Sequence, residues 1–204
     1  MKRLLAIVLT FIIVIGSMIA PSLIIMGVLA TPLFRFVFTE KWLPAVPYFQ
    51  ILCISGILYP FHVYNLNILN VKGRSDLFLK LEIIKKVLLV ITILVSIQFG
   101  LYGLLWGVVV SSALALCINA HYSGKFIHYN GFEQLKDVSP ILLIAIASGV
   151  LTLIADKIMT NSNITDIFRI ILGGAVGVLS YWSISIIFKI KSIQDLKTII
   201  LKQK

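Results

Sequence analysis

Residues 100–124 read GLYGLLWGVVVSSALALCINAHYSG, and no charged residue occurs between Lys86 and Lys125. The run shows no alternation of polar and apolar positions, so it does not predict a strand. In lipid only helices and closed barrels satisfy their backbone polar groups. At about 1.5 Å per residue, a helix of this length crosses roughly 30 Å of hydrocarbon. The stretch therefore predicts a transmembrane helix.

Similar apolar runs recur along all 204 residues, of which 59% are hydrophobic and only 13% are charged. The mean hydropathy of +1.04 is far above that of soluble domains. We predict an all-α, polytopic membrane helix bundle of six transmembrane helices with no large water-soluble domain. The predicted spans cover residues 4–30, 45–71, 77–98, 101–123, 139–159 and 167–188.

Most basic residues lie at the two ends or in the second and fourth connections, on one side of the predicted membrane. Only Arg35, Lys41, Lys157 and Arg169 fall on the opposite side. The positive-inside rule then places both termini in the cytoplasm. Residues 189–204 carry isoleucines and leucine at helical spacing between lysines. We expect a basic amphipathic tail along the inner membrane surface, or a plain stop-transfer flank.

The first residues also resemble a secretory signal, with Lys2 and Arg3 before an apolar run and small residues near Ala20. Apolar character continues to about Ala30, which is too long for such a signal. An uncleaved first span is therefore the favoured interpretation.

Several function classes find no support in the sequence. The net charge of +10 is typical of nucleic-acid binders, but here the basic residues lie between apolar segments, so we expect no nucleic-acid partner. The three histidines lack metal-ligand spacing, and no catalytic or phosphate-loop motif occurs. Asp156 beside Lys157 is interpreted as an interfacial pair. We expect neither an enzyme nor a cofactor or metal.

Prolines and glycines mark two kinds of helix packing. Pro21 and Pro60 interrupt two spans, and the connection between these spans holds further prolines, so kinks or breaks are expected. The pairs Gly103 with Gly107 and Gly173 with Gly177 have the small-xxx-small spacing that lets helix backbones approach closely. Close packing is the expected role of these pairs.

The third span, 77–98, is unusual because it contains Lys80, Glu82, Lys85 and Lys86. From Val87 onward its apolar part is only about 20 Å long, so Lys85 and Lys86 begin within the membrane slab. Glu82 is expected to pair with Lys86, four residues later. The lysines either snorkel to the headgroups or face a water-filled cavity that serves an ion or an anionic substrate.

Asparagines at the end of the second span add polar groups on the same cytoplasmic side. Asn67, Asn70 and Arg74 are predicted to share one helical face. Interhelical hydrogen bonding and sugar contact both explain the asparagines, Asn65 included.

Five short sequence motifs resemble those of a known family: PL at 32–33, TEKW at 39–42, VPYFQIL at 46–52, KGRSDLFLK at 72–80 and GLYGLLWG at 100–107. Together they resemble the polysaccharide-transporter branch of the O-antigen flippases, in the multidrug/oligosaccharidyl-lipid/polysaccharide exporter superfamily. The resemblance implies a bacterial inner-membrane carrier that moves a lipid-diphosphate-linked oligosaccharide to the outer leaflet. Such carriers have two similar lobes, and the chain is expected to match a C-terminal portion.

The resemblance also gives the charged residues a role. Arg74, Lys80, Lys85 and Lys86 are expected to contact the diphosphate headgroup, and Glu82, Asn67 and Asn70 to line a polar cavity. Expected partners are the lipid-linked oligosaccharide, membrane lipids, and a missing N-terminal lobe or polysaccharide-assembly proteins. The alternatives are a non-transporting membrane subunit or inactive remnant, and a membrane polymerase or ligase, although the short outward loops leave little room for an active site.

Overall fold

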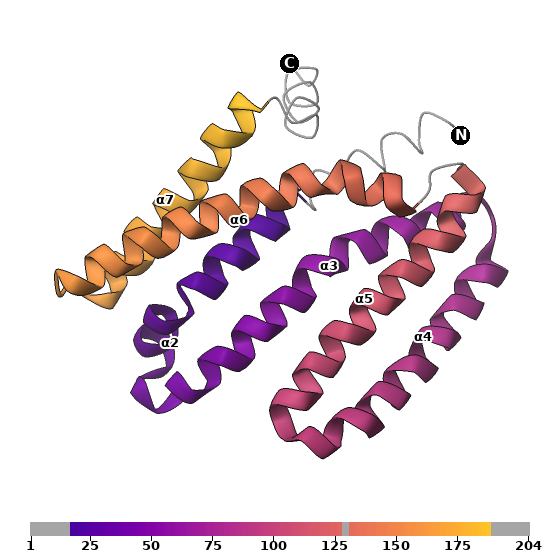
Figure 1. Ribbon diagram of the computed structural model, residues 1–204, viewed down its shortest axis with the longest axis horizontal. Helices are drawn as coiled ribbons and strands as arrows, with labels where there is room; N and C mark the ends of the chain where they lie inside the picture. Colours follow the sequence, from indigo (N-terminus) through magenta and orange to yellow (C-terminus); the bar gives the residue numbers. More distant parts are fainter. Residues whose placement is uncertain (1–16, 128–130, 189–204) are drawn as a thin grey trace. The chain divides into compact units, whose positions relative to one another are not determined.

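The computed structural model describes residues 17–127 and 131–188, and every regular element in these ranges is a helix (Figure 1). The prediction of an all-α membrane bundle is confirmed, and no strand occurs in the described ranges. In chain order the elements are a helix over Ser17–Val28, α2 (Ala30–Phe38), the 3-10 helix η1 (Glu40–Ala45), α3 (Val46–Val71), α4 (Ser75–Ser96), η2 (Ile97–Phe99), α5 (Gly100–Ile127), α6 (Gly131–Asn161) and α7 (Asp166–Ile187).

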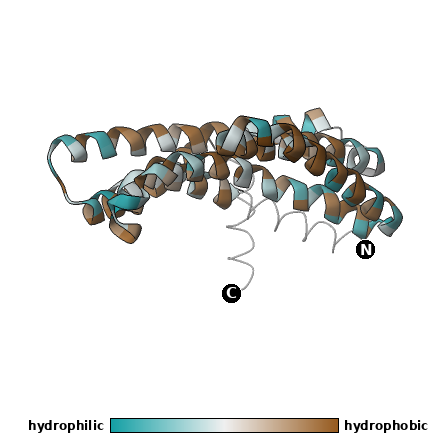
Figure 2. Ribbon diagram, turned by 90° about the horizontal axis from the view of Figure 1, so that it is seen from below, coloured by the Kyte–Doolittle hydropathy of each residue, from teal (hydrophilic) through white to brown (hydrophobic). Residues whose placement is uncertain are grey.

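Helix length and composition identify a multi-pass membrane protein. In the described part of the chain, four helical stretches are long and apolar enough to cross a membrane, or five if the bent pair Ser17–Val28 and Ala30–Phe38 is one span. One of the four, Ser75–Lys125, contains both α4 and α5, which pack together as a hairpin (Figure 1). Hydrophobic residues make up most of the helical ribbon, and hydrophilic ones are frequent near turns and helix ends (Figure 2).

Burial follows the pattern expected in lipid rather than in water. Large apolar side chains such as Leu94 and Leu179 are 64% and 66% exposed, whereas Asn119 and Thr152 are fully buried. Apolar side chains lose nothing by facing hydrocarbon, while polar groups need partners inside the protein. The helices therefore turn their polar residues inward.

The described residues form two compact units, one over 55–138 and the other over 17–54 with 139–188. The first unit contains the C-terminal part of α3 and the α4/α5 hairpin. The second contains Ser17–Val28, α2, η1, most of α6 and all of α7. Helices α3 and α6 each pass from one unit into the other.

Glycines allow the close packing of α5 on the end of α4 in the first unit. A Cβ atom added to Gly103 would lie 2.7 Å from the backbone oxygen of Ser96. One added to Gly107 would lie 3.0 Å from Ser96 Cβ and 3.1 Å from Thr92 Cγ2. The close approach predicted for this glycine pair is confirmed.

The second glycine pair has the same role in the second unit. A Cβ on Gly173 would lie 2.9 Å from Leu29 Cδ2, and one on Gly177 would lie 2.6 Å from Thr152 Oγ1. One turn further along α7, the Tyr181 hydroxyl donates a 2.6 Å hydrogen bond to the Ser17 carbonyl oxygen. Small residues and one tyrosine thus fix α7 against its neighbours.

Of the kinks or breaks expected at the prolines inside the spans, breaks do not occur. Pro21 and Pro60 lie inside helices that continue through them, so neither breaks its span. Instead the chain bends by 71° between Ser17–Val28 and α2. Pro32 lacks the N–H that would bond the carbonyl four residues earlier, which accounts for a bend just before it. The connection that was expected after residue 30 is largely helical, as α2 and η1; the start of the predicted span 4–30 lies outside the described residues.

A Schellman motif ends α3 and corrects the predicted face of Asn67, Asn70 and Arg74. Gly73, at φ 68°, donates to the Asn70 oxygen at 3.0 Å, and Arg74 donates its backbone N–H to the Leu69 oxygen at 2.9 Å. Since the helix stops at Val71, Arg74 belongs to the start of α4 and shares no helical face with the two asparagines.

Candidate functional site

Arg74 is held at the beginning of α4 by an ion pair that the sequence analysis did not foresee. Its Nε and Nη2 atoms donate to the two Asp76 oxygens at 3.0 and 2.9 Å. The hydrogen bond from Arg74 lowers the pKa of the Asp76 carboxyl. Because the Asp76 pKa is lower in the folded state, the pair stabilises the fold at pH values above the unfolded-state pKa of Asp76. This contribution disappears as the pH falls through the folded-state pKa. Both side chains are exposed, so the contribution is small.

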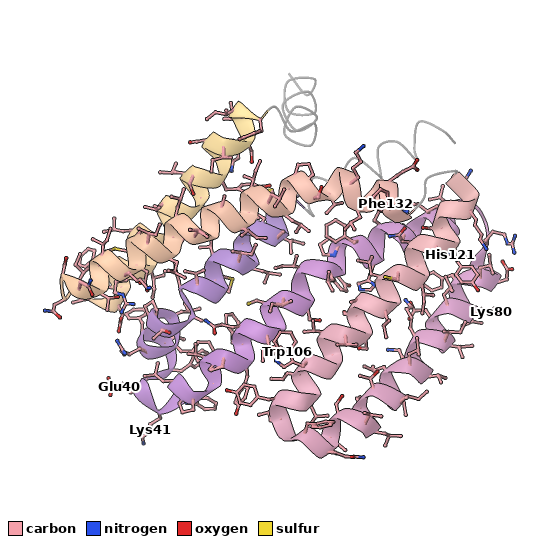
Figure 3. All side chains as sticks on the ribbon, in the orientation of Figure 1. Glu40, Lys41, Lys80, Trp106, His121 and Phe132 are labelled. Atoms are coloured by element: carbon pink, nitrogen blue, oxygen red, sulfur yellow. The ribbon has the colours of Figure 1, made fainter. Side chains whose placement is uncertain are left out.

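The charged side chains of α4 pair differently from the prediction. Lys85, not Lys86, binds the Glu82 carboxylate, at a spacing of three residues instead of four. The Lys85 side chain is only 14% exposed. Lys80 and Lys86 are exposed and form no ion pair within the described ranges; Lys80 projects from the first part of α4 (Figure 3). Two of the four predicted cations, Arg74 and Lys85, therefore have compensated charge, and two do not.

Polar side chains of α3 and α5 meet inside the first unit. Asn65, 1% exposed, accepts a hydrogen bond from the Ser123 hydroxyl and donates one to the Phe61 oxygen at 2.9 Å. The Asn119 amide nitrogen lies 3.3 Å from His62 Nδ1. For Asn65, interhelical hydrogen bonding is therefore the correct interpretation.

The ion pair of α4 lies at the same depth as these groups. His62 lies about 14 Å along α3 from the helix end at Val71, and Lys85 about 15 Å along α4 from its start at Ser75. We call His62, Asn65, Glu82, Lys85, Asn119 and Ser123 the polar cluster.

A buried atom of the polar cluster, Asn119 Oδ1, has no hydrogen-bond partner among the described residues. Leaving such a group buried and unsatisfied costs about 1–3 kcal/mol.

The structure thus brings together only part of the predicted site. Glu82 and Lys85 belong to the polar cluster, whereas Asn67 is half-buried and Asn70 exposed, and neither side chain joins the hydrogen bonds of the cluster. The sequence analysis missed His62, Asn119 and Ser123. The available signal was their spacing within apolar spans, three residues from His62 to Asn65 and four from Asn119 to Ser123, which puts each pair on one helical face.

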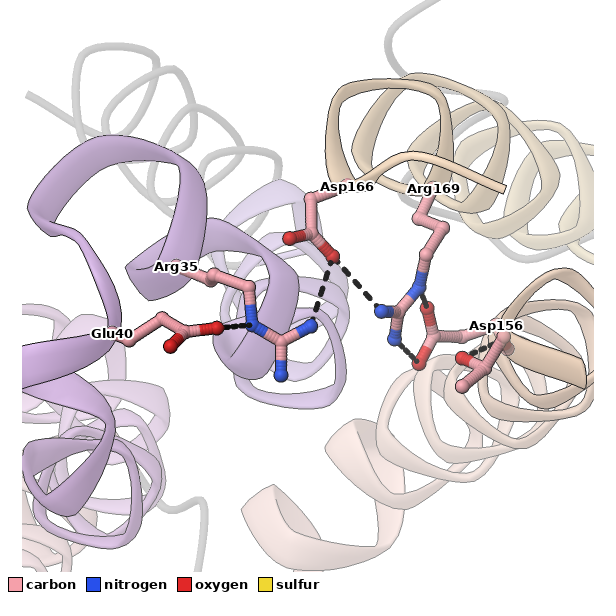
Figure 4. Close-up of polar contacts among 6 residues, drawn as sticks. Arg35, Glu40, Asp156, Asp166 and Arg169 are labelled. Atoms are coloured by element: carbon pink, nitrogen blue, oxygen red, sulfur yellow. Dashed lines mark hydrogen bonds and ion pairs between the residues drawn. The ribbon is translucent and has the colours of Figure 1, made fainter. Parts of the chain in front are cut away.

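A second polar group, the arginine network, lies in the second unit. Arg169 is 7% exposed and donates to both Asp156 oxygens and to Asp166 Oδ1, each at 2.9 Å (Figure 4). Asp166 also meets Arg35 at 3.5 Å, and Arg35 Nε lies 3.8 Å from a Glu40 oxygen. The network joins α2, α6 and α7 through charge-assisted hydrogen bonds, and it reaches η1 through the Arg35–Glu40 ion pair.

The network also corrects the interpretation of Asp156. This carboxylate binds Arg169 through two hydrogen bonds rather than the adjacent Lys157, which is exposed. Neighbouring residues on a helix point about 100° apart, so Asp156 and Lys157 do not face each other. The short turn between α6 and α7 places Arg169 opposite Asp156 instead.

Metal-ligating side chains do not gather in the described part of the chain. Its residues contain no group of three or more His, Cys, Asp or Glu side chains able to hold a metal ion. No family model matches the sequence, and no curated protein or solved structure matches the chain. The flippase resemblance therefore stays a prediction, and any function must be argued from the chain's own residues.

Proposed function

We propose that this chain forms part of a carrier that moves lipid-diphosphate-linked oligosaccharides across the bacterial inner membrane by alternating access. The observation that carries the proposal is the polar cluster, which holds an ion pair and buried polar side chains inside otherwise apolar spans. Ionisable residues within a membrane bundle are expensive and typically mark the path of a polar substrate. The short sequence motifs that resemble those of the polysaccharide transporters favour a lipid-diphosphate-linked oligosaccharide as that substrate.

The uncompensated cations on α4 supply the contact for the diphosphate. Lys80 and Lys86 are exposed and unpaired within the described residues, so their ammonium groups are free to bind phosphate oxygens as point charges. Arg74 is able to contribute a bidentate contact if the headgroup displaces Asp76. Each charge-assisted contact contributes roughly 1.5–3 kcal/mol, so losing two weakens binding by two or more orders of magnitude.

The test uses the bacterium that carries the gene. Deleting the gene should abolish a surface polysaccharide and cause its lipid-linked precursor to accumulate in the cytoplasmic leaflet. Complementation with the chain carrying Lys80→Gln and Lys86→Gln should leave export at least tenfold below wild type at matched protein levels. A chain with Lys125→Gln and Lys157→Gln, which removes two exposed lysines elsewhere, should restore export.

Two results would contradict the proposal at different levels. Normal export without the gene would show that the chain is not needed for transport, as expected of an inactive remnant. Normal export by the Lys80 and Lys86 variant, with loss of export on deletion, would leave the carrier function and refute only the headgroup contact. Precursor that reaches the outer leaflet but is not polymerised in the deletion strain would indicate a polymerase or ligase instead.

A further inference from the structure

Large apolar side chains are exposed where α2 leads into η1. Phe36, Val37, Phe38 and Trp42 are between 49% and 58% exposed, and we call these four residues the aromatic patch. With nine residues, α2 is about 14 Å long, so by itself it is too short to cross the hydrocarbon. The exposure of the aromatic patch therefore needs an explanation other than the lipid-facing side of a full span.

The arginine network places α2 at a level where spans begin and end. Residues 162–165 join the spans of α6 and α7, and Asp166 is the first residue of α7. Such a connection lies at a face of the membrane, because irregular backbone does not face hydrocarbon. Arg35 of α2 meets Asp166 at 3.5 Å (Figure 4), and η1 leads directly into α3. We infer that α2 lies at the membrane–water interface, beside the ends of these spans.

The direction of α2 also fits a position along the interface. The chain bends by 71° between Ser17–Val28, which belongs to the predicted first span, and α2. Gln50 of α3 supports the bend, since its amide nitrogen donates to the Gly27 carbonyl oxygen at 2.9 Å. Transmembrane helices are tilted by about 20° on average from the bilayer normal. A helix bent by 71° from such a span runs closer to the membrane plane than to the normal.

The rings near the aromatic patch form a continuous row that fixes it to α3. The ring of Trp42 lies 6.2 Å from that of Phe38, Phe38 lies 5.4 Å from Phe34, and Phe34 lies 5.3 Å from Phe49 of α3. Tryptophan is enriched at the headgroup level of membranes, because its ring is apolar and its N–H can bond water or headgroups. The patch therefore suits lipid at interfacial depth.

The exposed charges next to the aromatic patch do not favour one lipid charge over another. Glu40 and Lys41 are adjacent, exposed and opposite in sign, and Lys41 projects from η1 away from the helices (Figure 3). Arg35 already contacts Asp166 and Glu40. Attraction to anionic lipid requires an excess of basic residues, which this segment lacks. Its ring contacts thus fit a zwitterionic phospholipid.

We propose that α2 and η1 form an interfacial anchor whose aromatic patch binds the headgroup region of zwitterionic phospholipids. The bent pair Ser17–Val28 and α2 is then not a single span, because α2 lies along the membrane surface. In the predicted orientation the anchor lies in the outer leaflet. The arginine network ties it to α6 and α7. The proposal goes beyond the carrier function and does not depend on it.

The test measures the depth of Trp42 in the full chain in phosphatidylcholine vesicles. Trp106→Phe and Trp182→Phe leave Trp42 as the single tryptophan. Its fluorescence is compared in lipid brominated near the headgroup and in lipid brominated near the chain end, and then with acrylamide in the water. The shallow bromine should cause the larger loss of fluorescence. Adding phosphatidylglycerol should leave this order unchanged.

A tryptophan at mid-span is the matched control. Leu114 lies at the middle of α5 and is 48% exposed, so Leu114→Trp in a chain with all three native tryptophans changed to Phe reports on the bilayer centre. For this reporter the deep bromine should cause the larger loss. Phe38→Trp in the same tryptophan-free chain is a second reporter on α2, and it should show the same order as Trp42.

Four results would refute the proposal, each in a different way. If Trp42 and the Phe38→Trp reporter follow the order of the Leu114→Trp reporter, α2 crosses the hydrocarbon as half of a bent span. If acrylamide alone quenches Trp42, the aromatic patch faces water. If no quencher reaches Trp42, protein covers it, as in contact with a second copy of the chain. If the shallow bromine quenches Trp42 only when phosphatidylglycerol is present, charge and not the aromatic patch binds the lipid.

Discussion

Replacing Arg169 with Met should destabilise the second unit by about 3 kcal/mol. The substitution removes three hydrogen bonds of 2.9 Å and leaves Asp156 and Asp166, whose side chains are 16% and 18% exposed, without their shared cation. Removing one partner of a buried ion pair costs about 3–5 kcal/mol. We expect the lower end of that range because Asp166 keeps its 3.5 Å contact with Arg35.

The free energy of unfolding is measured in mixed micelles by titration with denaturing detergent. Lys157→Met is the matched control, since it removes an exposed cation next to Asp156 and should change stability by no more than about 0.5 kcal/mol. Adding Asp156→Asn to Arg169→Met should recover part of the loss, because one of the stranded charges is removed. If Arg169→Met proves as stable as Lys157→Met, the arginine network does not hold these helices together.

Two further predictions concern packing and topology. Gly103→Ala should lower the free energy of unfolding by about 1–3 kcal/mol, because the added Cβ would lie 2.7 Å from a backbone oxygen of α4. Gly174→Ala is the control, since its Cβ would meet nothing within 4 Å, and it should leave the free energy of unfolding unchanged. Equal effects of the two substitutions would refute close α4/α5 packing. For topology, single cysteines are introduced at Lys72 and Lys41 in a chain whose own cysteines are replaced. The cysteine at position 72 should resist an impermeant thiol reagent added to intact cells, and the one at position 41 should react. Labelling at position 72 would overturn the predicted orientation.

The apolar spans could be predicted from sequence because their signal is local. A run such as 101–123 must be helical in lipid wherever the rest of the chain lies, since its backbone polar groups have no other partners. The glycine pair Gly103 and Gly107 could be interpreted for a similar reason, as only small residues let two helices come so close. The Schellman turn at Gly73 was not foreseen, so Arg74 was placed on the wrong helix.

Side-chain partners could not be predicted in the same way, because they depend on which helix faces which. The sequence offered Glu82 two lysines within reach, at three and four residues, and helix geometry alone favours the second. The structure pairs it with Lys85, which is largely buried, and leaves Lys86 exposed. Asp156 likewise had an adjacent lysine but binds an arginine from the next helix.

The sequence by itself determined an all-helical multi-pass membrane protein, because apolar run length and the cost of unpaired backbone groups in lipid leave no other fold class. It also predicted that charges on α4 lie at membrane depth. Only the tertiary structure decided which polar residues meet, and the decisive pairs, His62 with Asn119 and Arg169 with Asp156, join different helices. Periodicity within one helix gives the face of a residue but carries no information about the neighbour that this face meets.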